Sequence, residues 1–204
     1  MRERVIDAAV VLTSEVGWSA VTMARLADDV GVSRQTVYNE IGCKPRLAEA
    51  MILRELDRFL GVVSVAFDEH PDDLVAAIGA ASEDVLVNAQ DNRLLHAVVS
   101  ATHGADTELL PLLTTHAESL LAAAKTVVAA RVAPYGIALS EARLDAAIDM
   151  VVRVVLSHVM QPSDTPARTA NDIAWIAERV LRPQAGGEEI HRVPGESGPS
   201  PLKD

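Results

Sequence analysis

Residues 22–47, TMARLADDVGVSRQTVYNEIGCKPRL, decide how the first part of this chain folds. Thr22 is a favourable helix N-cap, and the apolar residues after it recur at helical spacing. These apolar residues are Met23, Leu26, Ala27 and Val30. Gly31 follows where a helix end often requires a left-handed residue, and Ser33 then supplies a second N-cap. The stretch therefore predicts two short helices joined by a tight turn.

The second of these helices has one polar side. Val32 and Val37 are spaced to pack inward. The side chains left to project from its first two turns are Arg34, Gln35, Thr36, Tyr38 and Asn39. In a helix-turn-helix, the second helix enters the major groove with its N-terminal residues against the base edges. We therefore expect double-stranded DNA to be the partner of this segment.

The composition predicts an all-α protein. Hydrophobic residues make up 49% of the 204 residues and aromatic residues only 3%. Ala, Val and Leu predominate, which suits closely packed helices better than sheets. The chain opens Met-Arg-Glu-Arg without an apolar signal segment, and charges interrupt its richest apolar stretches. Because Cys43 is the one cysteine, no internal disulfide is expected, and we predict a cytoplasmic protein without a membrane partner.

The acidic charge lies outside the first 54 residues. The formal net charge is −11, yet residues 1–54 contain seven basic and seven acidic side chains. The rest of the chain holds 11 basic and 22 acidic side chains. Phosphate attraction is local, because charges are screened over about 8–10 Å. A neutral head with a few directed contacts predicts weak non-specific affinity, which favours a regulator specific for one operator.

Glycines and prolines divide the chain into about nine expected helices. Their expected ranges are 2–16, 22–30, 33–41, 44–67, 74–86, 92–101, 109–133, 140–159 and 165–183. We expect a three-helix DNA-binding head over residues 1–46 and a larger helical body over residues 47–183. Residues 184–204 are rich in Gly, Pro, Glu and Ser, and we expect this tail to be disordered.

The first 54 residues closely resemble the DNA-binding domain of TetR-family transcriptional repressors. The matching residues are Ile6-Asp7-Ala8-Ala9, Gly17-Trp18-Ser19-Ala20-Val21-Thr22, Leu26-Ala27, Gly31-Val32-Ser33-Arg34-Gln35-Thr36-Val37-Tyr38, Lys44, Leu47 and the stretch from Ala48 to Leu53. The remainder agrees only in its helical character. The resemblance implies a homodimeric repressor of a palindromic operator, released when an effector in the body shifts the helix over residues 44–67.

Eight polar residues are expected to contact DNA, by the resemblance and by their side-chain chemistry. Those whose side chains pair with guanine or adenine edges are Arg34, Gln35 and Asn39. Those expected at phosphates, as helix caps or as packing groups are Thr22, Ser33, Thr36, Tyr38 and Lys44. Two alternatives stay open: some of these residues lie on a merely solvated face, and only one or two reach bases.

Residues 39–41, Asn-Glu-Ile, depart from the aromatic pair that is common in the family. Ile41 preserves the apolar anchor. Glu40 places a carboxylate where a phosphate contact is frequent, and phosphate would repel it. Either Glu40 points away from DNA, or the operator is bound more weakly or at a different angle.

The resemblance also implies an effector pocket in the body. Its expected aliphatic walls are Leu86, Leu95, Val99, Leu113, Leu120 and Val152. Its expected polar groups are Arg93, His96, His103 and His116. So few aromatic residues favour a flexible aliphatic effector, such as a fatty acid or acyl derivative, over a flat dye. No three or four ligands converge by spacing, so neither a metal nor another cofactor is expected.

The last two helices are expected to pair with those of a second copy, through Ile148, Val152, Val155, Ile176 and Val180. The alternative is that these stripes close the core of one subunit. No catalytic motif is present, so we do not expect an enzyme. Two other functions stay open: a helical-bundle enzyme or binding protein with a vestigial helix-turn-helix, and a constitutive DNA-binding module without an effector.

Overall fold

The described part of the chain contains helices and no strands, which confirms the all-α prediction. The computed structural model describes residues 1–96 and 110–181, with side chains for all of these except 110–117. The helices are α1 (Arg2–Val16), α2 (Met23–Val30), α3 (Arg34–Ile41), α4 (Lys44–Glu69), α5 (Leu74–Gln90), α7 (Leu110–Val132), α8 (Glu141–Met160) and α9 (Pro166–Leu181). Residues 93–96 are also helical. The predicted tail over residues 184–204 and the end of the helix expected over 92–101 lie outside the described residues.

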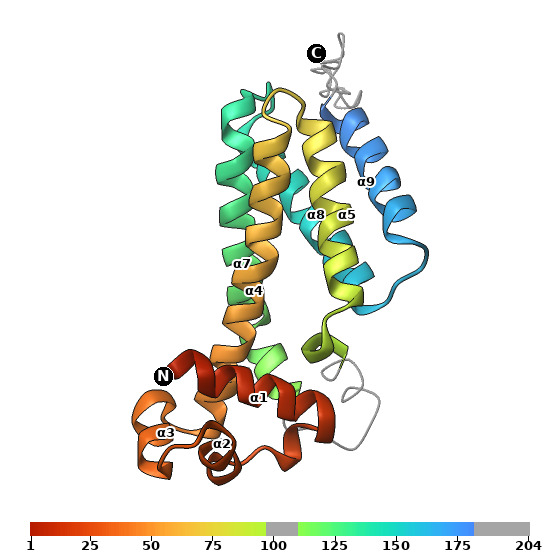
Figure 1. The fold of residues 1–204 in the computed structure, drawn as a ribbon. Helices are drawn as coiled ribbons and strands as arrows, with labels where there is room; N and C mark the ends of the chain where they lie inside the picture. Colours follow the sequence, from red (N-terminus) through yellow and green to blue (C-terminus); the bar gives the residue numbers. More distant parts are fainter. Residues whose placement is uncertain (97–109, 182–204) are drawn as a thin grey trace, which may run out of the picture.

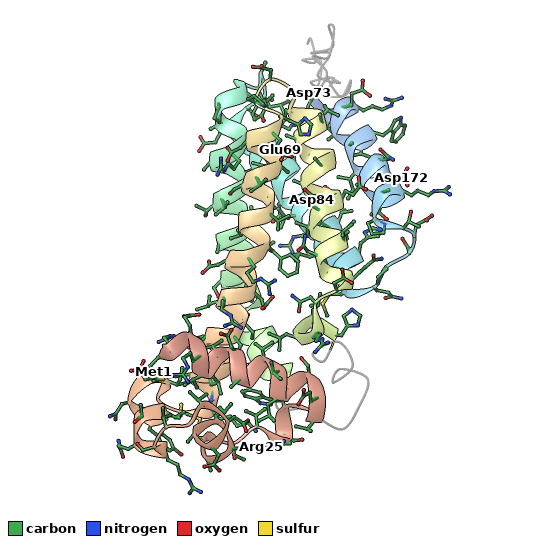
Figure 2. The ribbon with its side chains drawn as sticks, viewed as in Figure 1. Met1, Arg25, Glu69, Asp73, Asp84 and Asp172 are labelled. Carbon is green, nitrogen blue, oxygen red and sulfur yellow. The ribbon has the colours of Figure 1, made fainter. Side chains whose placement is uncertain are left out.

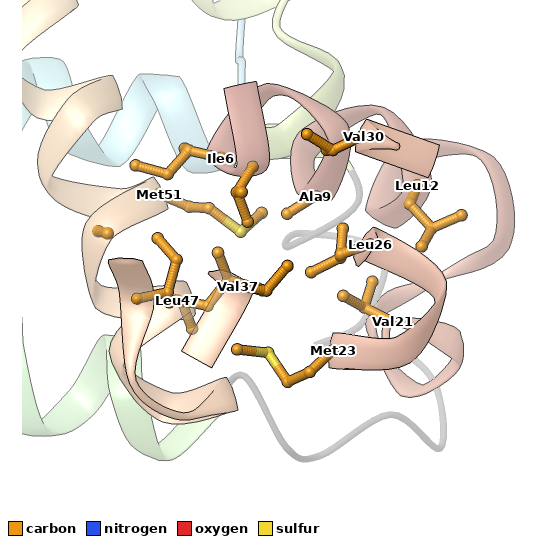
Figure 3. Close-up of a cluster of buried hydrophobic side chains, with 14 of the residues drawn as sticks. Ile6, Ala9, Leu12, Val21, Met23, Leu26, Val30, Val37, Leu47 and Met51 are labelled. Carbon is orange, nitrogen blue, oxygen red and sulfur yellow. The ribbon is translucent and has the colours of Figure 1, made fainter. Parts of the chain in front are cut away.

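The helices α1, α2 and α3, together with the start of α4, form a small head around one hydrophobic core (Figure 3). Local capping fixes their ends as the sequence predicts. The Thr22 hydroxyl accepts a hydrogen bond from the Arg25 amide at 3.2 Å, and the Ser33 hydroxyl accepts one from the Thr36 amide at 3.1 Å. Gly31 has a φ of 73° and ends α2 in the left-handed conformation.

The helix α4 belongs to both the head and the body. It is 26 residues long and rises from the head into a bundle with α5, α7 and α8, while α9 packs against α5 (Figure 1). Two apolar clusters fill the body. Buried residues of the cluster near the loop between α4 and α5 are Ala66, Phe67, Leu74, Ala77, Ala81 and Val132. Those of the second cluster are Ala124, Ile148 and Val152.

Tyr135, just after α7, fastens the far end of α4. Its hydroxyl donates to the His70 carbonyl at 2.7 Å, with the Phe67 carbonyl at 3.4 Å, and its ring meets the ring of Phe67 edge-on. Both carbonyls lie at the helix end and also accept the amides of His70 and Asp73, at 3.4 and 3.2 Å, so the tyrosine adds a further bond to each. Burial raises the pKa of Tyr135, and the nearby carboxylates of Asp72, Asp68 and Asp73 raise it further. The hydroxyl therefore stays a donor at neutral pH. No helix in residues 1–96 and 110–181 is both long and apolar enough to cross a membrane.

Leu47 tests how far the head depends on α4. Its side chain is fully buried in the head core, whereas Leu53 on the same helix is 47% exposed. Leu47→Ala should lower the free energy of unfolding by about 2–5 kcal/mol, because it removes buried atoms and leaves a cavity. Leu53→Ala should change it by less than about 0.5 kcal/mol. Urea unfolding followed by circular dichroism measures both variants, and equal losses would contradict this account of the core.

Candidate nucleic-acid interface and body cavities

The helix α3 turns a polar side away from the protein. Val37 and Ile41 are 0% and 5% exposed and anchor the helix in the head core. The predicted contact residues Arg34, Gln35, Tyr38 and Asn39 are all exposed. Gln35 Nε2 donates to Asn39 Oδ1 at 2.9 Å, which joins these two side chains. The structure thus brings the predicted base-contacting residues together on one accessible helix.

The predicted contact residues Thr22, Ser33 and Thr36 lie at or near the first residue of a helix. Thr22 and Ser33 cap α2 and α3, and the Ser33 and Thr36 hydroxyls are 2.9 Å apart. Thr22 and Ser33 are exposed and Thr36 is half-buried. Capping alone accounts for the placement of these hydroxyls, and their contact with phosphate stays a prediction.

Lys44 is the first residue of α4 and is held against Trp18. Its Nζ atom lies 4.9 Å from the Trp18 ring centroid and 3.5 Å from the Ser19 carbonyl oxygen, to which it donates. Trp18 itself is 3% exposed and belongs to the head core. The ammonium group is thus held near Trp18, and Lys44 belongs to the first turn of α4, the end of a helix where anions bind favourably.

Glu40 does not share the outer stripe of α3. At about 100° per residue, it lies roughly 60° from Val37 around the helix axis, whereas Gln35 and Asn39 each lie roughly 160° from Val37. Its side chain is half-buried. Of the two explanations open from the sequence, this placement favours a carboxylate that points away from DNA.

Two of the head's arginines bind groups of the protein itself. Arg4 donates to the Val30 carbonyl at 3.0 Å, and Arg54 on α4 pairs with Asp7 on α1 at 2.6 Å. Figure 2 shows Arg25 in the head and Glu69, Asp73, Asp84 and Asp172 in the body. Two of the seven basic side chains of residues 1–54 are thus used inside the protein.

The body contains a cavity of about 210 Å³ beside the end of α5. Three of the predicted pocket residues line it: Leu86, Leu95 and His96. His158 and Thr169 line it as well, and the sequence did not single them out as pocket residues, because only the fold brings α8 and α9 beside residue 96. His96 Nε2 lies 2.8 Å from the Gln90 carbonyl, and His158 Nδ1 lies 2.9 Å from the Val154 carbonyl.

The other predicted pocket residues are dispersed. Val152 is buried in the core cluster of α7 and α8, and Leu120 is half-buried on α7. Val99 and His103 lie outside the described residues, and Leu113 and His116 are on α7 without described side chains. Arg93 lines a different cavity, of about 760 Å³, at the junction of head and body. No cluster of three or more metal-binding side chains occurs in residues 1–96 and 110–181.

A buried carboxylate stands at this junction. Glu55 in α4 is 9% exposed and accepts hydrogen bonds from Asn92 Nδ2 at 2.6 Å and from Arg58 Nη1 at 3.3 Å. The Oδ1 atom of Asn92 in turn accepts from the Leu95 amide at 2.8 Å. Leu94, which lies between Asn92 and Leu95 in the sequence, is 5% exposed and belongs to the head core. The short segment after α5 thus contacts the head, α4 and the smaller cavity.

Two family descriptions match this chain. "Bacterial regulatory proteins, tetR family" matches residues 5–51, and "Bacterial Tetracyclin repressor, C-terminal domain" matches residues 73–179. This chain belongs to the TetR family. Its members are DNA-binding transcription regulators and not enzymes. The resemblance seen in the first 54 residues is therefore confirmed and extends to the body.

Individual TetR-family relatives match almost the whole chain. The HTH-type transcriptional regulator AlkX of Mycobacterium tuberculosis is 27% identical over 194 residues, which cover 95% of this chain and 89% of that protein. The crystal structure of the repressor AlkX from Dietzia sp. strain DQ12-45-1b has a TM-score of 0.69 and 27% identity, and covers 88% of this chain and 94% of that one. FadR of Bacillus subtilis, in complex with stearoyl-CoA, shares the fold at a TM-score of 0.59 and 15% identity, with 89% and 98% covered.

The residues expected at a TetR-family dimer interface are buried, half-buried or exposed in the subunit. Ile148 and Val152 are 7% and 9% exposed and pack inside the subunit, which agrees with the alternative left open by the sequence. Val155 is half-buried. Ile176 and Val180 on α9 are 51% and 47% exposed. A partner is therefore expected to meet Ile176 and Val180 rather than Ile148 and Val152.

Lys44→Gln tests the phosphate contact. The variant should bind specific and unrelated DNA more weakly by a similar factor, and the slope of log affinity against log salt should fall by about 1, because one counterion fewer is released. Fluorescence anisotropy at several salt concentrations measures the slope. Lys125→Gln in the body is the matched control, and a Lys44→Gln slope equal to that of the control would refute the contact.

Proposed function

We propose that this TetR-family protein is a cytoplasmic repressor that binds a palindromic operator as a homodimer and releases it on binding a small hydrophobic effector. The accessible polar side of α3, with Arg34, Gln35 and Asn39 exposed on a rigidly anchored helix, is the observation that carries the proposal. Such a helix reads base edges in the major groove. Membership of the family supports regulation of transcription by this contact.

A homodimer accounts for the apolar surface of α8 and α9. The large apolar residues exposed there are Met150 (62%), Leu156 (45%), Met160 (42%), Trp175 (55%), Ile176 (51%) and Val180 (47%). Exposed large apolar side chains gathered on two helices of a folded domain are typical of an interaction surface. In a twofold dimer, the two heads reach half-sites about 34–36 Å apart, which is why a palindromic operator is expected.

Two charges on α9 should separate the dimer. The double substitution Ile176→Asp and Val180→Asp places two carboxylates in the proposed interface, where burying them without partners costs more than the dimer gains from its apolar packing. The variant should therefore be a monomer at micromolar concentration, and sedimentation velocity measures its mass. Val65→Asp on α4, where Val65 is 55% exposed, is the control and should remain dimeric. A dimeric α9 variant would count against this interface.

An aliphatic effector is supported by the walls of the smaller cavity and by the relatives. Leu86, Leu95, Val159 and Met160 line the cavity, with the histidines as its polar groups. The Dietzia repressor is implicated in biodegradation of n-alkanes, and the Bacillus subtilis regulator of the same fold was crystallised with stearoyl-CoA. About 210 Å³ is below the 300–1,000 Å³ of drug-sized sites, so the effector enters by widening the cavity.

Widening the cavity acts on the head through the segment that follows α5. Leu95 and His96 line the cavity, whereas the adjacent Leu94 is embedded in the head core. Asn92 ties the same segment to Glu55 in α4. A ligand that displaces residues 95–96 therefore shifts Leu94 and α4 together, and the position of the heads changes. Release of DNA requires only that the effector binds this second arrangement better.

A gel shift on DNA from upstream of the protein's own gene tests the function. The retarded band should appear with the protein alone and diminish with decanoate, palmitoyl-CoA or hexadecane. A band that none of these ligands affects would indicate a constitutive DNA-binding module. No band on that DNA, together with no sequence enriched from a random library, would indicate a vestigial helix-turn-helix.

Leu94→Ala tests the route between cavity and head. The variant should keep operator binding but lose most of the effector response, because the head no longer follows the displaced segment. We expect the effector to lower the operator affinity of the wild type by a factor of about 5 to 150. In the variant, this factor should be about tenfold smaller. Anisotropy with the effector identified by the gel shift measures it, with urea unfolding as a check that the variant is folded. Exposed Leu53→Ala is the control, and an unchanged response in Leu94→Ala would exclude this route.

A further inference from the structure

Gln35 and Asn39 occupy the outermost position of α3. They are one turn apart and exposed, and they lie on opposite sides of the line directly away from buried Val37. Arg34 and Tyr38 lie to one side of this line, roughly 60° and 100° from Val37 around the helix axis. When α3 enters a major groove, Gln35 and Asn39 are therefore the pair that faces its floor.

The hydrogen bond between the two amides leaves a defined set of groups for DNA. Gln35 Nε2 donates one hydrogen to Asn39 Oδ1 at 2.9 Å. Gln35 keeps its second N–H and its carbonyl oxygen, a donor beside an acceptor on one planar group. Asn39 keeps both of its N–H donors. The contact also restrains two side chains that would otherwise be ordered only when DNA binds, so the pair is arranged in advance.

This set of groups fits one base. Adenine presents an acceptor, N7, beside a donor, the N6 amino group, in the major groove. Guanine presents two acceptors, N7 and O6, and would leave the Gln35 carbonyl facing an acceptor. Cytosine offers only a donor, and thymine only an acceptor and a methyl group. A glutamine with one donor and its carbonyl is therefore complementary to adenine alone.

We propose that Gln35 specifies an adenine in each half-site, and that Asn39 is a positioning residue that holds the Gln35 amide for this contact. The proposal rests on the proposed function, since it assumes that α3 reads DNA. A bidentate contact of this kind discriminates against other bases by about 5- to 150-fold. Gln35→Glu keeps the shape but replaces the donor with an acceptor, so the preference should change from adenine to cytosine.

The experiment is selection of bound DNA from a randomised duplex library by the full-length protein, followed by sequencing. The wild type should enrich a palindrome with adenine at one fixed position of each half-site. Gln35→Ala should lose the preference at that position alone, and Gln35→Glu should prefer cytosine there. Asn39→Ala should keep adenine with discrimination reduced by about three- to tenfold, since Gln35 is no longer held.

Other outcomes of this selection distinguish a failure of the adenine assignment from a failure of the proposed DNA binding. Asp29→Asn, an exposed substitution on α2, is the control and should leave every preference unchanged. If Gln35→Ala, folded by circular dichroism, enriches the wild-type sequence unaltered, the adenine assignment is wrong while DNA binding stands. If Asn39→Ala matches the wild type in discrimination, Asn39 has no positioning role. If the wild type enriches no sequence, the proposed function is overturned, and the inference with it.

Discussion

The helix α4 must pack into two hydrophobic cores at once, and the rest of the structure depends on this constraint. Its first turns place Leu47 and Met51 in the head core, and its last turns place Ala66 and Phe67 in the body. A helix of 26 residues spans about 39 Å, so its ends are held by separate groups of side chains. Because neither core can lose its part of α4 cheaply, the proposed effector response would pass along α4 as a rigid element.

Glu55 marks the place along α4 where the two cores meet. A buried carboxylate is costly unless it is paired and hydrogen-bonded, and here Asn92 and Arg58 provide the partners. An apolar residue at this position would offer no hydrogen bond to Asn92 or Arg58. The charge instead fixes the register between Asn92 and α4, which keeps Leu94 in the head core. The junction is thus held by a directional contact rather than by apolar packing alone.

The sequence predicted most of what is determined locally. Thr22, Gly31 and Ser33 fix the turn of the helix-turn-helix within a few residues, and the structure has them in the expected conformations. What the sequence could not predict depends on contacts between distant segments. Nothing local separates Leu94, which enters the head core, from Leu95, which lines a cavity. The apolar stripe of α8 likewise does not reveal that Ile148 and Val152 face the subunit's interior, because any apolar stripe suits either a core or an interface.

The charge distribution determines how strong the coupling between effector and DNA has to be. Arg4 and Arg54 are used inside the protein, and the body is acidic, so we expect a weak sequence-independent attraction to DNA. Under the proposed function, occupancy of an operator would then depend mainly on the bases that α3 contacts. A regulator that owes most of its binding free energy to contacts with the DNA phosphates would stay on DNA even with its base contacts broken. Under the proposed function, a small misalignment of α3 would therefore remove much of the binding energy, and a modest difference in effector affinity between the two arrangements would suffice for release.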